Sequence, residues 1–178
     1  MGMTRDSFYD QTILEGLEDE NIESRIAAIQ AMGMIRSKTG TEKLLFIATN
    51  CKNTQEKLAA TISLGLIGDD KATSHLINLL EDEEPNIRWD AAIGLAKMGN
   101  KSGLYIIESL LDRDYLNGFP EVDELEKTKA IMVAIEVSSI LQDKKLKTKL
   151  VSLAESDKNL KIRNAAIQTL ESTYNISI

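Results

Sequence analysis

The sequence predicts an all-α fold in which about five pairs of helices stack in a row. An alanine-rich segment recurs five times, and its copies begin at Arg25, Lys57, Arg88, Ile131 and Arg163. Apolar residues within the copies are three and four positions apart, the spacing of one helix face, and Ala is the strongest helix former. Aromatic residues make up only 4% of the chain. This scarcity argues against a β-sandwich or barrel, because strands are enriched in aromatic residues.

Each copy has the pattern expected for the second helix of a pair. A small alanine stands three residues after each start, where it lets two helix axes approach closely; these are Ala28, Ala60, Ala91, Ala134 and Ala166. A larger apolar residue follows four positions later in four copies (Met32, Leu64, Leu95 and Leu170), and Ser138 takes that place in the fourth copy. An amphipathic segment precedes each copy, over about residues 5–17, 42–49, 73–80, 104–111 and 146–154.

Turn signals separate these ten segments. They are Thr39-Gly40, Gly68-Asp69-Asp70, Glu84-Pro85-Asn86 and Gly99-Asn100, and Pro is well tolerated in the first turn of a helix. The pattern predicts one domain over residues 1–178 with repeats at about 4–37, 38–69, 70–100, 101–143 and 144–175.

An acid and an arginine recur six residues apart in three of the copies. The pairs are Asp19 with Arg25, Asp82 with Arg88, and Asp157 with Arg163. The acid falls in the turn between two helices and the Arg in the first turn of the second helix. We expect each planar guanidinium to bridge carboxylates and carbonyls of its own and the adjacent repeat, as a structural ladder. The second copy has Cys51 and Lys57 at these positions and the fourth has Leu125 and Ile131, so the ladder is predicted to be interrupted there.

The pattern Asp-x5-Arg-x2-Ala-Ala/Ile-x2-Leu-Gly/Ala resembles the HEAT repeat, and it is most similar to the short HEAT-like repeats of phycobilisome lyases. The resemblance covers about Asp6 to Tyr174. It implies a right-handed α-solenoid whose second helices line the concave side. It does not specify a function, because proteins with such repeats include adaptors, scaffolds, bilin lyase subunits, an iron-dependent hydroxylase and an alkylpurine DNA glycosylase.

The charge distribution is uneven. The chain holds 28 acidic and 21 basic residues, and its net charge of −7 divides into −11 over residues 1–126 and +4 over residues 127–178. A nucleic acid is therefore not an expected partner, because such binding relies on Lys and Arg. The charges either solvate helix faces or let the basic end meet an acidic partner or another copy. No apolar run suits a membrane span and the N-terminus does not resemble a signal peptide, so we expect a cytoplasmic location.

Residues that carry chemistry are scarce. His75 is the only histidine and Cys51 the only cysteine, which excludes His-rich metal sites and an intrachain disulfide. The acidic run at residues 81–84 lacks the spacing of a calcium loop and is interpreted as a solvated turn. Phosphate loops, nucleophile elbows and dinucleotide fingerprints are absent from the sequence. We therefore expect no catalytic residue, no metal and no cofactor.

Two features are candidates for partner binding. The first is a stripe along the second helices, formed by Leu58, Ile62, Trp89, Ile93 and Met132. These side chains either pack between repeats or form an apolar groove in which a partly exposed Trp89 is the anchor, since Trp is frequent among binding hot spots. We predict the exposed arrangement, with Trp89 close to Leu58 and Met132.

The second feature is an insertion of 11–12 residues at positions 112–123, where the spacing between copies rises to 43 residues from 31–32 elsewhere. It carries Tyr115 and Phe119. It forms either a functional protrusion or an extension of the next helix, which would then run over about Asp123–Ile140, capped by Asp123 with Glu126 three residues later.

These observations favour a non-enzymatic module, a monomer or weak homo-oligomer, that binds another protein on its concave face. The alternative, implied by the resemblance alone, is a bilin lyase-like subunit that handles a tetrapyrrole. A third function, DNA-base excision, needs a basic concave face, which the acidic charge of residues 1–126 disfavours.

Overall fold

The computed structural model describes residues 5–177, with side chains from Tyr9 onward, and its regular structure is entirely helical. The described residues form eleven α-helices and two short 3₁₀ helices, and they contain no strand. The predicted all-α class is therefore confirmed. The chain divides into two compact units, Met1–Met98 and Gly99–Ile178. This division falls two residues before the predicted boundary between the third and fourth repeats. The prediction of a single domain stays a prediction.

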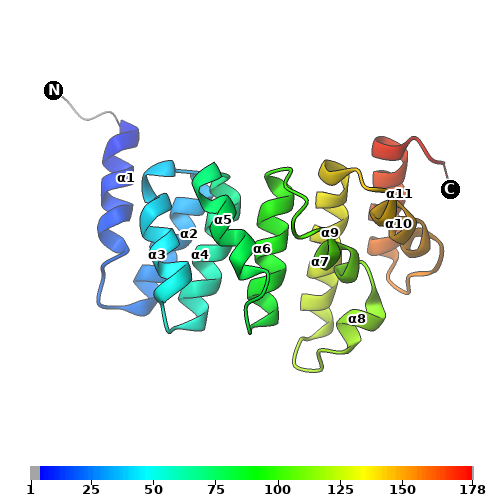
Figure 1. The fold of residues 1–178 in the computed structure, drawn as a ribbon, viewed down its shortest axis with the longest axis horizontal. Helices are drawn as coiled ribbons and strands as arrows, with labels where there is room; N and C mark the ends of the chain where they lie inside the picture. The colour runs from blue at the N-terminus through cyan, green and yellow to red at the C-terminus, as the bar shows by residue number, and fades with distance from the viewer. Residues whose placement is uncertain (1–4, 178) are drawn as a thin grey trace. The chain divides into compact units, whose positions relative to one another are not determined.

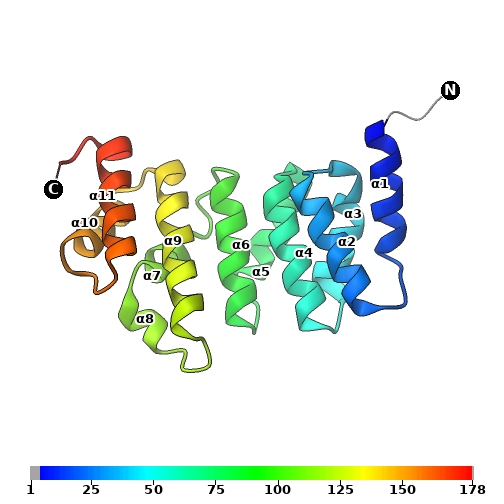
Figure 2. The same ribbon diagram turned by 180° about the vertical axis from the view of Figure 1, so that it is seen from behind.

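The first unit contains six helices in two layers. They are α1 (Arg5–Gly16), α2 (Ile22–Met34), α3 (Thr41–Asn50), α4 (Thr54–Ile67), α5 (Thr73–Leu79) and α6 (Pro85–Lys97), with 3₁₀ helices at Lys38–Gly40 and Asp70–Ala72. Figure 1 is seen from the side of α3 and α5. Figure 2 shows α2, α4 and α6 side by side on the opposite face, in agreement with the packing of α4 against both α2 and α6.

The second unit contains five helices. They are α7 (Leu104–Leu110), α8 (Arg113–Asn117), α9 (Glu124–Leu141), α10 (Lys144–Ser156) and α11 (Leu160–Tyr174). Within this unit α9 packs against α7 and α11, and α10 packs against α11. The ten predicted helices are thus present, and α8 is an additional one within the insertion.

Asx caps begin most of the second helices. The side chains of Asn21, Asn53, Asp123 and Asn159 each accept a hydrogen bond from a backbone N–H in the first turn that follows, which satisfies one of the otherwise unpaired donors of a helix start. The start of α6 instead has Pro85 in its first turn, where a missing N–H costs nothing.

The repeated small and large apolar residues form the core. All five alanines are buried, and so are Met32, Leu64, Leu95, Leu170 and Ser138. The Ser138 hydroxyl donates to the Ala134 carbonyl oxygen at 2.7 Å, which satisfies a polar group at an apolar position. Glycines let two of the second helices approach closely, because a Cβ added to Gly65 would lie 2.6 Å from the Gly94 Cα. The backbones of α4 and α6 are therefore in contact at this point.

The insertion contains a short helix, and the helix that follows it is lengthened. Four of the second helices begin three residues before the aligned repeat start, whereas α9 begins seven residues before it. Asp123 caps α9 by accepting from the Glu126 N–H at 2.7 Å. Of the two alternatives that the sequence left open, a lengthened following helix is present, and α9, with 18 residues, is the longest described helix. The remaining residues form α8, in which Leu116 is buried and the rings of Tyr115 and Phe119 meet edge to face at 5.2 Å.

Candidate functional site

The predicted apolar stripe is exposed in part. Ile62 on α4 is 40% exposed, while Leu58 on α4, Ile93 on α6 and Met132 on α9 are half-buried. Trp89 is only 5% exposed. The prediction that Trp89 reaches water is therefore wrong, and this residue belongs to the core.

The water-facing arc of α6 is narrower than the sequence pattern suggested. Between positions 90 and 97 the residues that reach water are Asp90, Ile93 and Lys97, which fall within an arc of about 60° at 3.6 residues per turn. Position 89 lies about 40° beyond the edge of this arc. A stripe drawn through positions 89, 93 and 97 thus combines one core position with two surface positions.

A small groove lies between α4 and α6, and we call it the α4–α6 groove. Its volume is about 30 Å³, and it is lined by Ile62, Gly65, Leu66, Asp90, Ile93, Gly94 and Lys97. The two helices come into contact at Gly65 and Gly94. Larger side chains flank this contact, so the groove is shallow, mostly apolar and open to water.

Asp90 is the distinctive group of the α4–α6 groove. It makes no hydrogen bond or ion pair with another described residue, and burial raises its carboxyl pKa to about 7, an effect that the positive charge of Lys97 partly offsets. A signal for this site was present in the sequence. The other four copies carry Ala27, Ala59, Val133 and Ala165 at the same position, so an acid stands where the repeat elsewhere has a small or apolar residue.

The raised pKa of Asp90 predicts a dependence of stability on pH. The folded state binds the proton more tightly than the unfolded state, so this contribution is complete below about pH 4 and is lost as the pH rises through 7. The expected loss between pH 5 and pH 8 is about 2–3 kcal/mol. Asp90→Asn should abolish this loss in urea denaturation, whereas Asp70→Asn, at an exposed position of the same unit, should retain it. Equal pH slopes for wild type and Asp90→Asn would contradict the assignment.

The predicted ladder exists, and its arginines use backbone carbonyls. Within the repeats, Arg25 donates to the Asp19 carbonyl oxygen at 2.8 Å, Arg88 to that of Asp82 at 2.6 Å, and Arg163 to that of Asp157 at 2.6 Å. The three carboxylates instead accept from the backbone N–H two residues later. The predicted proximity of each pair is confirmed. The aspartate carboxylate stabilises the turn, and the backbone carbonyl oxygen of the same aspartate accepts the hydrogen bond from the arginine.

Other residues connect adjacent repeats. Arg25 also donates to both carboxylate oxygens of Glu56 on α4, at 2.6 and 3.2 Å, and these hydrogen bonds lower the Glu56 pKa. Lys57 forms an ion pair with Asp82 of the next repeat. The predicted interruption at the second copy is therefore wrong, because a lysine at the arginine position still reaches the following turn. In the fourth copy Leu125 is exposed and Ile131 is buried, so the ladder is interrupted there as predicted.

Removal of Arg88 should test the structural role of the ladder. Its guanidinium satisfies the carbonyl oxygens of Asp82 and Glu83. Arg88→Ala should lower the free energy of unfolding by about 1–3 kcal/mol, because it leaves these acceptors without a protein donor. Chemical denaturation monitored by circular dichroism measures the loss. An unchanged denaturation midpoint would show that the two hydrogen bonds contribute nothing to stability.

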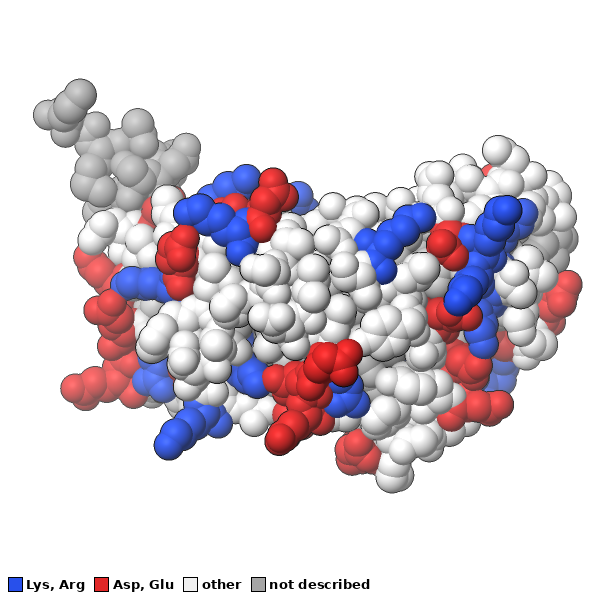
Figure 3. All heavy atoms as spheres, viewed as in Figure 1, with Lys and Arg blue, Asp and Glu red and all other residues white. Residues whose placement is uncertain are grey.

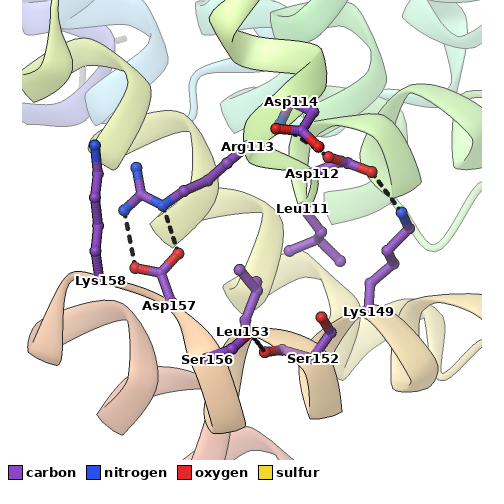
Figure 4. Close-up of a pocket in the computed structure, with 10 residues that line it drawn as sticks. All are labelled: Leu111, Asp112, Arg113, Asp114, Lys149, Ser152, Leu153, Ser156, Asp157 and Lys158. Carbon is purple, nitrogen blue, oxygen red and sulfur yellow. Dashed lines mark hydrogen bonds and ion pairs between the residues drawn. The ribbon is translucent and has the colours of Figure 1, made fainter.

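A hollow of about 340 Å³ lies between the insertion and the turn from α10 to α11 (Figure 4). Arg113, at the start of α8, donates to both carboxylate oxygens of Asp157 at 2.6 and 2.9 Å. Burial raises the Asp157 pKa, but the hydrogen bonds from Arg113 and from the Asn159 N–H, together with the positive charges of Arg113 and Lys158, outweigh it and hold the pKa below its usual range. Nearby, Lys149 donates to Asp112 at 2.7 Å. The bases of the hollow are thus paired with acids, and no sequence signal pointed to Arg113.

The remaining sequence candidates are His75, Cys51 and the acidic turn 81–84, and the two side chains His75 and Cys51 make hydrogen bonds within the fold. The His75 ring is hydrogen-bonded to the Thr49 hydroxyl, which connects α5 to α3, and the Cys51 thiol donates to Glu56 at 3.4 Å. The acidic turn 81–84 borders a wide polar hollow, and acidic side chains gather below α5 and α6 in Figure 3.

Among the described residues no group of three or more His, Cys, Asp and Glu side chains is placed to hold a metal ion. No helix in the described part of the chain is long and apolar enough to cross a membrane.

Comparison with known proteins identifies the fold. Residues 41–116 match the family model for HEAT repeats, and none of the curated proteins matches the chain. Among similar solved structures is the complex of CpcE and CpcF of phycocyanin lyase from Nostoc sp. PCC7120. The two sequences are 19% identical, and the structural alignment covers 97% of this chain and 78% of that chain with a TM-score of 0.60. The predicted resemblance to HEAT-like repeats of phycobilisome lyases is confirmed, and it extends to the fold alone.

Proposed function

We propose that this protein is a non-enzymatic binding module that holds a segment of a partner protein on the face formed by α2, α4 and α6. The observation that carries the proposal is the α4–α6 groove, where partly exposed apolar side chains surround a carboxyl group without a hydrogen-bond partner among the described residues. Apolar surface around a few polar groups is typical of binding sites. The HEAT repeats support the same function, because stacked repeats provide extended binding surfaces.

A matched pair of variants tests this proposal. Ile62 on α4 is 40% exposed and Ile77 on α5 is 37% exposed, so a charge is tolerated about equally well at both positions. Partners captured from the source cell by the wild type should be retained by Ile77→Glu and lost with Ile62→Glu. A partner that is lost only with Ile77→Glu would place the binding surface on the opposite layer and contradict the proposal.

A second candidate function is the handling of a tetrapyrrole. It is favoured by the similarity to the phycocyanin lyase complex. The hollow at Arg113 offers Arg113, Lys149 and Lys158 to the carboxylates of such a ligand. We place this function second because each of these bases is already paired with an acid, Asp157, Asp112 and Glu124 respectively. A saturable change in bilin absorbance on titration with the protein would reverse this order, whereas an unchanged spectrum is expected.

A further inference from the structure

We propose that the α4–α6 groove recognises a lysine or arginine side chain of the partner, whose alkyl stem lies on Ile62, Leu66 and Ile93 and whose charged end meets Asp90. This inference rests on the proposed function and adds the chemistry of the residue that is bound.

The lining of the groove suits such a side chain. A basic residue has an apolar stem and a charged end, and it packs its stem along apolar surface. Ile62 and Leu66 of α4 and Ile93 of α6 supply the apolar surface, and the Asp90 carboxylate supplies the acceptor. A hydrogen bond between two charged groups is stronger than one between neutral groups, so Asp90 fixes the identity of the residue that enters.

The chain itself leaves the carboxyl group of Asp90 available. Lys97 is the one cation that lines the groove, and it forms no ion pair with Asp90 within the described structure. It stands seven positions further along α6, which corresponds to a rise of about 10.5 Å along the helix axis. An incoming cation can therefore approach Asp90 without first displacing a partner.

Charge complementarity favours a basic segment over a neutral or acidic one. Residues 1–98 carry 16 acidic and 10 basic side chains, a net charge of −6. This charge attracts a basic segment towards the unit and repels an acidic one. In a complex with an acidic segment, like charges would lie opposite each other and weaken the binding.

The titration of Asp90 gives the binding a characteristic pH dependence. With a pKa of about 7, the carboxyl group is mostly protonated at pH 6 and mostly ionised at pH 8. Around it, α4 contributes Ile62, Gly65 and Leu66, none of which carries an ionisable side chain, and α6 contributes Lys97. His75 of α5 is hydrogen-bonded to Thr49 on α3. Because a basic residue pairs with the ionised form, affinity should be about tenfold higher at pH 8 than at pH 6.

The experiment uses the full chain and a phage-displayed library of random peptides as the probe. Selection on the wild type should enrich peptides with Lys or Arg flanked by apolar residues. A synthetic peptide of the selected sequence should lose at least tenfold in affinity towards Asp90→Asn and retain its affinity towards Asp70→Asn. Replacing its basic residue by norleucine should lower affinity for the wild type and cause no further loss with Asp90→Asn.

The alternative outcomes separate this inference from the proposed function. Peptides without a basic residue that are blocked by Ile62→Glu would leave the protein-binding function standing and overturn the inference. Basic peptides that bind Asp90→Asn as tightly as the wild type would also overturn it, since they would be responding to the overall charge. A library that yields no binder would contradict both.

Discussion

Replacing Trp89 by Ala should lower the free energy of unfolding by about 3–5 kcal/mol, the range for truncation of a large buried aromatic residue. Trp89 is 5% exposed and lies on a helix in which Ile87, Ala91 and Leu95 are also buried. Its removal therefore leaves a cavity in the core. The loss is measured by urea denaturation followed by circular dichroism, because the variant has no tryptophan to report by fluorescence.

Phe46 provides the control for this prediction. It is an aromatic residue of the same unit that is 68% exposed, so Phe46→Ala should have a small effect on stability. In the wild type, the single Trp89 should fluoresce in the blue and be protected from a soluble quencher until the protein unfolds. A Trp89→Ala variant as stable as Phe46→Ala would show that the indole is not packed.

The helices could be predicted from the sequence because the information that specifies them is local. Alanines and larger apolar residues recur at helical spacing, and Asn and Asp stand at the cap positions, so each predicted helix appears within a few residues of its observed bounds. The same repetition identifies the core. Ala60 and Ala91 face inward for the same reason in successive copies, because each must let the neighbouring helix approach.

The site could be predicted only in part because exposure depends on neighbouring helices. The sequence indicated Ile62 and Ile93, which line the groove, and wrongly indicated Trp89. The periodicity of one helix gives the direction of its apolar face, but the width of that face depends on how many helices pack around it. Asp90 was detectable as an acid at a position that is otherwise Ala or Val.

The interactions between repeats depend on three-dimensional reach rather than on fixed spacing. Lys57 contacts Asp82 and Arg25 contacts Glu56, although neither Lys57 nor Glu56 matches the Asp–Arg pattern. A flexible side chain one repeat away can replace a missing arginine. The pairing of Arg113 with Asp157 spans 44 residues and involves the insertion, so no periodic pattern could have revealed it.

Replacing Arg113 by Ala should lower the free energy of unfolding by about 3–5 kcal/mol, the range for removing one partner of a buried ion pair. The side chain of Asp157 is fully buried and accepts two hydrogen bonds from Arg113. Without Arg113 the carboxylate stays buried and keeps the backbone N–H of Asn159 as a donor. The unpaired charge is then the main cost, and urea denaturation at neutral pH measures it.

The pH dependence distinguishes this ion pair from simple packing. In the wild type the Asp157 pKa lies below its usual range, so the stability that it contributes is present above about pH 4 and is lost as the pH falls through the folded-state value. In Arg113→Ala burial is no longer opposed by the guanidinium, and the pKa should rise. The variant should then recover part of its lost stability as the pH is lowered from 7 to 5, over a range in which Asp157 of the wild type does not titrate.

Two further variants make the prediction specific to the charge. Lys158→Ala removes an ion pair with Glu124 in which both side chains are well exposed, and it should leave the stability almost unchanged. The double variant Arg113→Met with Asp157→Leu replaces both charges by apolar groups, and it should be considerably more stable than Arg113→Ala, because no buried charge is left without a partner. If the double variant is instead as unstable as Arg113→Ala, the loss comes from packing around α8 rather than from an unpaired Asp157.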